Sequence, residues 1–453
     1  LIMLRSLRPL THATRRRGVR ELHLVLNHRV RGMKQSATLR INEMSNQLIR
    51  EGRSVVKLGL GQSPFPVVPP MVEALRENAH QKDYLPVKGL HRLREQVATY
   101  AKDEMGIGGR TADDVLVGPG SKELLFLIQL CFQGELLLPN PSWVSYAPQA
   151  QIIDRNIVWL ETTYEDGWML NPATLRAHLE AAEVGEDIPR LLVLNSPSNP
   201  TGRTLPRKAL AEIASIARAY GMLVLSDEIY AETTLDGRHR SIAEYYPEGT
   251  IISHGVSKGF GAGGWRLGVH IFPPSCRRLL DAMAVVASET FTSVSAPIQH
   301  AAVVAYENRE DVQAYVRDSQ HVLQSLGLWC SHRLREGGLR CHDPNGGFYL
   351  FPCWASHKDR LRARGIFTSA QLAETILNET GVAFLPGSDF GRPATELNCR
   401  LAFVAFDGEN ALANAANLPP DRANPAATEP WLREHCPDVL DGIERIVQWT
   451  EAV

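Results

Sequence analysis

The 453-residue sequence has few of the patterns that mark disulfide-rich or metal-binding proteins. Its seven cysteines are scattered, odd in number and nowhere spaced as C-x-x-C, which argues against a disulfide framework or a zinc site. The fifteen histidines show no H-E-x-x-H or comparable ligand spacing. We therefore expect no bound metal, and the pattern of cysteines favours a reducing compartment.

The sequence also lacks long apolar runs and an excess of charge of either sign. No run approaches the ~20 residues that a membrane-spanning helix needs, so we expect no membrane association. The formal net charge of −2 gives no electrostatic footprint for nucleic acid. The remaining composition, 44% hydrophobic and 22% charged, is that of a globular chain with room for two or three domains.

The first forty residues differ from the rest, because they contain ten Lys and Arg residues and one acid, Glu21. Arg-rich, acid-poor composition is typical of organelle transit peptides. A disordered basic tail and translated upstream sequence are the alternatives, since the chain begins with Leu1 and has methionines at positions 3 and 33. We expect residues 1–38 to lie outside the fold of an intracellular protein, in the cytoplasm or, with a transit peptide, in a mitochondrion or plastid.

Uninterrupted apolar runs alternate with helical segments through the middle of the chain. Residues 191–194 and 222–225 have the pattern of strands buried on both faces, and residues 208–220 between them have that of a helix. This βαβ rhythm predicts an α/β fold with a doubly wound, mostly parallel sheet, and ligands bind such sheets at the carboxyl ends of the strands. The polar residues at those ends are Asn195, Asn199, Asp227, Tyr230 and Lys258.

The last third of the chain has an α+β pattern, with a long helix followed by short strands such as G-G-F-Y-L-F. We predict a three-layer α/β/α large domain over residues 76–308 and a smaller α+β domain over residues 309–453. Residues 39–75 are expected to form an N-terminal arm that packs with the small domain. Residues 409–436, rich in Ala, Asn and Pro, are expected to be a surface excursion.

One lysine stands in a glycine-rich turn between two apolar runs, within residues 251–272. Lys258 is followed by four glycines and then by Arg266. A lysine whose pKa falls on desolvation can attack a carbonyl as the neutral amine, and an arginine can hold a pair of phosphate oxygens. The turn therefore suits an amine beside a bound phosphate, although a solvated loop with a surface lysine is the simpler alternative.

A second turn also has features of a phosphate site. Residues 115–117 predict a strand, residues 118–121 a turn, and Glu123 begins a buried helix. Backbone N–H groups and the hydroxyl of Ser121 at the start of a helix could cradle a phosphate. The alternative is that Ser121 simply caps the helix.

Several separated motifs, in the right order, resemble the class I/II aminotransferases, which are pyridoxal-phosphate enzymes of fold type I. The motifs are N-P-T-G at Asn199, D-E-I-Y at Asp227, S-K at Ser257 followed by G-W-R-L-G, and R-L-A-F at Arg400. The resemblance extends from about Ser36 to the C-terminus. It implies a two-stage transfer of an amino group from an L-amino acid to a 2-oxo acid.

The resemblance also implies the roles of the catalytic residues. Lys258 would hold pyridoxal phosphate as a Schiff base (an internal aldimine) and would then move the proton of the substrate's α-carbon. Asp227 would pair with the pyridine nitrogen and keep it protonated. Tyr230 and Asn199 would hydrogen-bond the phenolate oxygen of the ring, and Asn199 would also lie near the substrate.

Further residues are implied to bind the cofactor or the substrate. Trp143 would stack on the ring, Arg400 would clamp the substrate's α-carboxylate, and the backbone of Gly61 would lie near that carboxylate. Tyr84 resembles the tyrosine that reaches the phosphate of the neighbouring subunit, which implies a homodimer. The positions that match phosphate-binding residues or their neighbours are Gly120, Ser121, Lys122, Ser257 and Arg266.

The sequence departs from the family pattern at two places. Gly255 stands where many relatives have a serine, so one phosphate hydroxyl is expected to be missing. No Arg or Lys lies between Arg278 and Arg309, where the aspartate-specific branch has an arginine for a second carboxylate, so that cation would have to come from elsewhere. The residues expected to line the side-chain pocket are Gln62, Ser63 and Phe65.

Two other functions fit parts of the pattern. A carbon–sulfur lyase or a cyclopropane-forming synthase of the same fold would share Lys258, Asp227 and Arg400 and would break a different bond. A non-catalytic ligand-sensing domain would need a helix-turn-helix before residue 40, and the basic segment is too short and shows no such pattern. An aminotransferase is therefore the favoured function.

Overall fold

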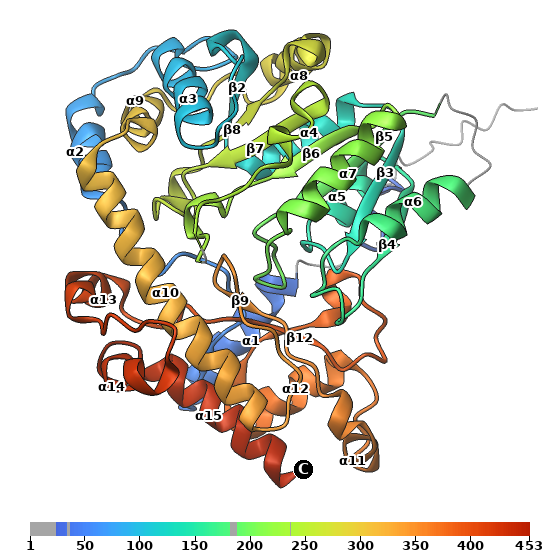
Figure 1. Ribbon diagram of the computed structural model, residues 1–453, viewed down its shortest axis with the longest axis vertical. Coiled ribbons are helices and arrows are strands. Elements are labelled where there is room, and N and C mark those ends of the chain that lie inside the picture. Colours follow the sequence, from blue (N-terminus) through green and yellow to red (C-terminus); the bar gives the residue numbers. More distant parts are fainter. Residues whose placement is uncertain (1–23, 34–36, 182–187, 236) are drawn as a thin grey trace, which may run out of the picture.

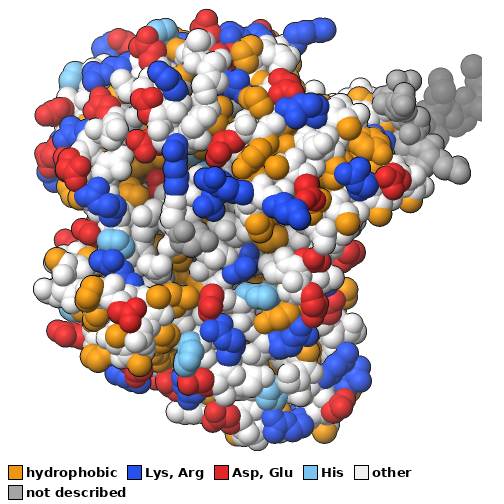
Figure 2. All heavy atoms as spheres, in the orientation of Figure 1, with side chains coloured by type: hydrophobic (Ala, Val, Ile, Leu, Met, Phe, Trp, Pro, Cys, Tyr) orange, Lys and Arg blue, Asp and Glu red, His pale blue; other side chains and the backbone are white. Residues whose placement is uncertain are grey.

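The computed structural model describes residues 24–33, 37–181, 188–235 and 237–453, which form two lobes (Figure 1). Most of the basic segment predicted for residues 1–38 lies outside the described residues, so its nature stays a prediction. Within the described ranges, no helix is long and apolar enough to cross a membrane. Acidic and basic side chains are interspersed over the face shown in Figure 2.

A seven-stranded sheet forms the centre of the larger lobe. Its strands lie in the order β2 (Val115–Gly118), β8 (Gly268–Ile271), β7 (Thr250–Gly255), β6 (Leu223–Asp227), β5 (Arg190–Asn195), β3 (Glu135–Asn140) and β4 (Ile157–Glu161). All neighbouring pairs are parallel except those made by β8, which is antiparallel to β2 and β7. The predicted α/β fold with a mostly parallel sheet is confirmed.

Helices cover both faces of this sheet. One face is covered by α4 (Ser121–Cys131), α5 (Tyr146–Ile152) and α8 (Arg277–Thr290), and the other by α6 (Pro172–Ala181) and α7 (Arg207–Ala219) (Figure 1). On β5, Leu191 and Val193 pack in the first layer, whereas Leu192 and Leu194 pack in the second. Because both faces of β5 are buried, its apolar run is continuous rather than alternating.

A smaller lobe lies below the sheet in Figure 1, and α10 (Glu310–Glu336) runs from the larger lobe into it. Its antiparallel sheet contains β11 (Leu385–Pro386), β12 (Cys399–Ala402) and β9 (Tyr349–Leu350), and β1 (Val56–Lys57) pairs in parallel with β10 (Val382–Ala383). The remaining helices of this lobe include α1 (Ala37–Arg50), α11 (Lys358–Ala363), α12 (Ser369–Thr380) and α15 (Pro437–Ala452). In the larger lobe, α3 (His91–Asp103) packs beside β2, and α9 (Ala296–Ala302) packs against α3 and α2 (Pro69–Asn78).

The segment 409–436, expected as a surface excursion, contains two helices that pack against α10. The side chain of Asp407 accepts backbone N–H bonds at the start of α13 (Gly408–Ala413). Asn424 caps α14 (Pro425–His435) in the same way, and a proline occupies its first position. These caps start regular helices in a segment whose composition alone suggests an irregular one.

Candidate active site

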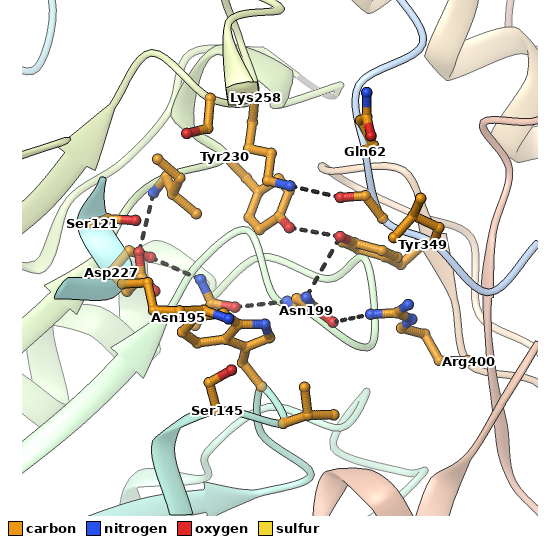
Figure 3. A pocket seen from close by; sticks show the side chains of 18 of the residues that line it. Gln62, Ser121, Ser145, Asn195, Asn199, Asp227, Tyr230, Lys258, Tyr349 and Arg400 are labelled. Atoms are coloured by element: carbon orange, nitrogen blue, oxygen red, sulfur yellow. Dashed lines mark hydrogen bonds between the residues drawn. The ribbon is translucent and has the colours of Figure 1, made fainter. Parts of the chain in front are cut away.

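A cavity of about 540 Å³ lies where the carboxyl ends of β5, β6 and β7 meet the smaller lobe (Figure 3). The strand register places Asn195 beside Asp227, and Asp227 beside Ser253. The side chains that follow these strands therefore share one edge of the sheet. The predicted site residues that line the cavity are Gly61, Ser121, Lys122, Trp143, Asn199, Asp227, Tyr230, Ser257, Lys258, Arg266 and Arg400.

Lys258 projects into this cavity from the turn after β7 (Figure 3). Its Nζ donates a hydrogen bond to the carbonyl oxygen of Gly61 at 2.6 Å. Desolvation lowers the pKa of Lys258 to about 8, and the positive charges of Arg400 and Arg266 contribute to the shift. About a tenth of the amine is therefore neutral, and hence nucleophilic, at pH 7, far more than for a lysine with an ordinary pKa.

This low pKa predicts how the cofactor-free protein captures pyridoxal phosphate. Because only the neutral amine of Lys258 attacks a carbonyl, the rate should increase about fivefold between pH 7 and pH 8 and level off above about pH 9. The measurement is the appearance of visible absorption after mixing at a series of pH values. A rate that still rises tenfold per pH unit beyond pH 9 would show a lysine with an ordinary pKa.

Asp227 ends β6 and is 3% exposed. The hydroxyl of Tyr146 donates to its Oδ2 at 2.6 Å, and the backbone N–H of Ile229 lies 3.4 Å from Oδ1. Burial raises the pKa of Asp227 to about 6, against the effect of these two donors. The carboxylate is therefore a buried acceptor that a protonated ring nitrogen would stabilise.

Two tyrosines and an asparagine form a hydrogen-bond network on the opposite side of the cavity (Figure 3). The hydroxyl groups of Tyr230 and Tyr349 lie 2.6 Å apart, and the side-chain amide nitrogen of Asn199 lies 3.5 Å from the Tyr349 hydroxyl. Gly61 packs so closely on this network that a Cβ atom there would lie 2.0 Å from the Tyr349 hydroxyl. Glycine is therefore required at position 61.

Arg400, on β12, enters the cavity from the smaller lobe and is 2% exposed. Its Nη1 donates to Asn199 Oδ1 at 3.1 Å, and its Nη2 donates to the carbonyl oxygen of Gly59. The guanidinium lies 4.8 Å from the centre of the Tyr349 ring. Its Nε is buried and has no hydrogen-bond partner among the described residues. A buried guanidinium with an unused donor suits a carboxylate ligand.

The start of α4 and the loop that carries Arg266 approach each other closely. Gly120, with φ +90°, has no space for a side chain, because a Cβ atom would lie 2.3 Å from Arg266 Nη2. A Cβ atom at Gly268 would similarly lie 2.2 Å from the backbone nitrogen of Ser121. Backbone N–H groups, hydroxyls and a guanidinium thus meet at a helix N-terminus, which is the donor set that a phosphate needs.

Gly255 stands where the family resemblance leads us to expect a serine, and it has little space for a side chain. A Cβ atom at Gly255 would lie 2.9 Å from the carbonyl oxygen of Leu267 and 3.0 Å from the Cα atom of Gly268. A serine would require backbone displacement between β7 and β8. Close packing of these two strands therefore favours glycine here, and the missing phosphate hydroxyl stays a prediction.

Three residues that we expected at the site do not line the cavity. Tyr84 is 90% exposed and does not line the cavity within this single chain. Gln62 lines the cavity, but Ser63 is not among the described lining residues. Phe65 is 5% exposed and packs edge-on against Tyr315 in the core, so it does not contribute to the pocket.

Two residues of the site were not assigned a role from sequence. Tyr146 supports Asp227, and Tyr349 connects Tyr230 with Asn199. Both tyrosines lie in apolar surroundings, where an aromatic residue indicates core packing. Their places in the sequence are the only signals that could have indicated a role. Tyr146 comes three residues after Trp143, and Tyr349 lies within G-G-F-Y-L-F.

Residues 53–416 match the family model for aminotransferase class I and II. The chain belongs to this family. Members of the class I and II aminotransferases are pyridoxal-phosphate enzymes that act on amino acids and oxo acids, and the function predicted from the motifs is confirmed at this level.

Related enzymes cover most of the chain. The aspartate aminotransferase of Geobacillus stearothermophilus is 31% identical over 390 residues, which are 84% of this chain and 94% of the relative. The aspartate/prephenate aminotransferase of Thermus thermophilus is 32% identical over 371 residues, 81% and 91% of the two chains. A solved structure of aspartate aminotransferase from Thermus thermophilus with maleate has a TM-score of 0.76 at 30% identity and covers 87% of this chain and 98% of that one.

Proposed function

We propose that this aminotransferase binds pyridoxal phosphate at Lys258 and moves the amino group of an acidic L-amino acid, with aspartate as the first candidate, to a 2-oxo acid. One observation carries the proposal. The Lys258 amine and the buried Asp227 carboxylate face the same cavity as the buried guanidinium of Arg400, which comes from the other lobe (Figure 3). A nucleophilic amine, an anion for a cationic ring and a carboxylate clamp are the groups that transamination requires.

The residues present fit the cofactor. The close approach of Gly120 to Arg266 leaves a phosphate-sized set of donors at the N-terminus of α4, to which the hydroxyls of Ser121 and Ser257 contribute. Trp143 lines the cavity and would cover one face of the ring. When bound, pyridoxal phosphate supplies an electrophilic carbonyl carbon and a ring that withdraws electrons from the substrate's α-carbon.

The chain's own residues would then orient the substrate and move its proton. Arg400 would bind the α-carboxylate with its free donors, and Asn199, which already accepts from Arg400, would keep the guanidinium in place. The Nζ of Lys258, once released from the carbonyl of Gly61, would remove the proton from the α-carbon and deliver it back during transfer. Asp227 would remain ionised and hold the proton of the ring nitrogen.

A further cation in the cavity, besides Lys258, Arg266 and Arg400, supports an acidic substrate. Lys122 lines the cavity from α4 in the larger lobe, and its Nζ lies 5.0 Å from the centre of the Trp143 ring. It could receive a side-chain carboxylate while Arg400 holds the α-carboxylate. The relatives are named for aspartate, and the Thermus thermophilus structure contains maleate, a dicarboxylate. Lys122 is thus our candidate for the cation that the interval between Arg278 and Arg309 lacks.

The variant Lys122→Met tests this assignment. It should raise the KM for aspartate by about 10- to 100-fold and leave the KM for alanine within about twofold, because only aspartate has a second carboxylate. Arg400→Ala is the matched comparison and should raise the KM for both substrates. Equal changes for aspartate and alanine in Lys122→Met, or a weakened affinity for pyridoxal phosphate instead, would assign Lys122 to the phosphate site.

We also propose a homodimer in which the exposed Tyr84 reaches the phosphate site of the neighbouring subunit. Tyr84 is 90% exposed in the single chain, so its side chain is accessible to a second subunit. Sedimentation equilibrium would test the assembly, and a monomer that retains full activity would contradict it.

A location in the cytoplasm, a mitochondrion or a plastid depends on residues 1–38 and stays a prediction.

A further inference from the structure

A buried histidine–glutamate pair lies behind the Lys258 turn and takes no part in the site described above. His254, on β7, is 1% exposed, and its Nε2 lies 2.7 Å from Glu232 Oε1. Glu232 belongs to a short 3-10 helix, η2 (Ala231–Thr233), which directly follows Tyr230. Burial of two such groups is costly unless they are paired, and neither is among the described residues that line the cavity.

Two tyrosines enclose the pair. The hydroxyl of Tyr100 donates to Glu232 Oε1 at 2.6 Å, and the hydroxyl of Tyr306 lies 3.3 Å from His254 Nδ1. The centres of both tyrosine rings lie 5.7 Å from that of the imidazole. Each imidazole nitrogen therefore has an oxygen partner, as a protonated histidine requires, and the rings exclude water.

The surrounding charges favour the ionised form of both partners. Burial opposes a charge on His254, but the charge and hydrogen bond of Glu232, together with the charges of Glu228 and Asp227, outweigh it, so the pKa of His254 is raised. Burial likewise opposes the Glu232 carboxylate, but the charge of His254 and the hydrogen bonds from His254 and Tyr100 together outweigh it, so the pKa of Glu232 is lowered. Both shifts favour the ion pair over the neutral pair.

The pair lies against the two segments that carry the proposed catalytic residues. Gly259, the residue after Lys258, packs directly on Glu232: a Cβ atom there would lie 2.5 Å from Glu232 Cβ and 2.7 Å from its Oε2. His254 is next in sequence to Ser253, the residue that pairs with Asp227 across β6 and β7. Burial raises the pKa of Asp227, and the charge of His254 opposes that increase.

We propose that His254 and Glu232 form a positioning pair, which holds the Lys258 turn from behind and supplies a positive charge that keeps Asp227 ionised. This inference rests on the proposed roles of Lys258 and Asp227. The pair lies outside the cavity and therefore acts through these residues rather than on the substrate.

The variants His254→Gln and Glu232→Gln test the inference, because each removes the ion pair and retains a hydrogen-bonding side chain. With pyridoxal phosphate bound, the pH midpoint of its visible absorption change should rise by about 0.5–1 unit in His254→Gln, since loss of a nearby positive charge favours proton binding. The rise should be smaller in Glu232→Gln, because the carboxylate that favours protonation of His254 is lost there together with its own negative charge. The value of kcat should fall about tenfold, and KM should stay within about twofold because Arg400 is unchanged. If His254→Gln fails to fold, Glu232→Gln carries the same test.

The matched control is His270→Gln. His270, on β8, is fully buried like His254, but burial lowers its pKa to about 3, so its imidazole is neutral over the pH range of the test and its replacement removes no charge. This control should lower Tm to a similar degree and leave the midpoint unchanged. Lower Tm in all three variants with no change in any midpoint would mean a purely structural role and would overturn the inference.

The outcomes separate this inference from the proposed function. A wild-type protein that forms no visible band with pyridoxal phosphate would overturn the proposed role of Lys258 and the inference with it. A wild-type band with unchanged midpoints in His254→Gln and Glu232→Gln would overturn the inference alone. A raised midpoint in both variants, absent from His270→Gln, would support it.

Discussion

Alanine in place of Lys258 should lower kcat by at least about 10⁴-fold, because the variant lacks both the attaching amine and the base that moves the α-proton. Noncovalent binding of pyridoxal phosphate should survive, since Ser121, Arg266 and Asp227 are unchanged. The measurement is turnover of aspartate, together with equilibrium binding of pyridoxal phosphate.

A charge-preserving variant separates the chemistry of Lys258 from its charge. Lys258→Arg keeps a cation in the cavity, but a guanidinium is not deprotonated in proteins and cannot act as nucleophile or base. It should be as inactive as the alanine variant. A small primary amine added to Lys258→Ala should restore part of the proton transfer. Turnover near the wild-type rate in either variant would contradict the role of Lys258.

Removal of the Asp227 carboxylate should have the second largest effect. Asp227→Ala would leave a protonated ring nitrogen without its buried anion, and we expect a loss of about 3–5 kcal/mol of transition-state stabilisation, or about 10²–10⁴ in kcat. The pyridoxal phosphate affinity should fall as well. Steady-state kinetics with aspartate and a titration with the cofactor measure the two effects.

The controls for Asp227 use its own hydrogen-bond partner. Tyr146→Phe keeps the ring and removes the hydroxyl that lies 2.6 Å from Oδ2, so we expect only a small loss in kcat, within about tenfold. Asp227→Glu should retain more activity than Asp227→Ala, since it keeps a carboxylate. A near-normal rate for Asp227→Ala would remove this residue from the mechanism.

Local sequence pattern was sufficient to predict the fold. The continuous apolar run of β5 indicated a strand covered on both faces, and Leu191 and Leu192 do face different helical layers. The pattern could not predict the helices within 409–436, because their start depends on the capping side chains Asp407 and Asn424 rather than on apolar periodicity.

The site residues that follow strands were accessible to sequence reasoning, because parallel strands end at one edge of the sheet. Contacts between distant segments were not. Tyr349 reaches the Tyr230 hydroxyl across 119 positions of sequence, and a tyrosine in an apolar run has the pattern of a core residue. Phe65 was expected to line the pocket but is buried in the core. The neighbouring prolines indicate a turn, but they do not indicate which side chains of that turn are buried.

The proposed function requires that Lys258 carries the cofactor and that the site accepts an amino group from an acidic amino acid. The most direct measurement is the visible spectrum of the holoenzyme during addition of single amino acids without an oxo-acid acceptor. We expect aspartate to remove the visible band and to release one oxo acid per site, with alanine much less effective. A band that no amino acid removes, or repeated release of oxo acid without an acceptor, would contradict it and favour a lyase.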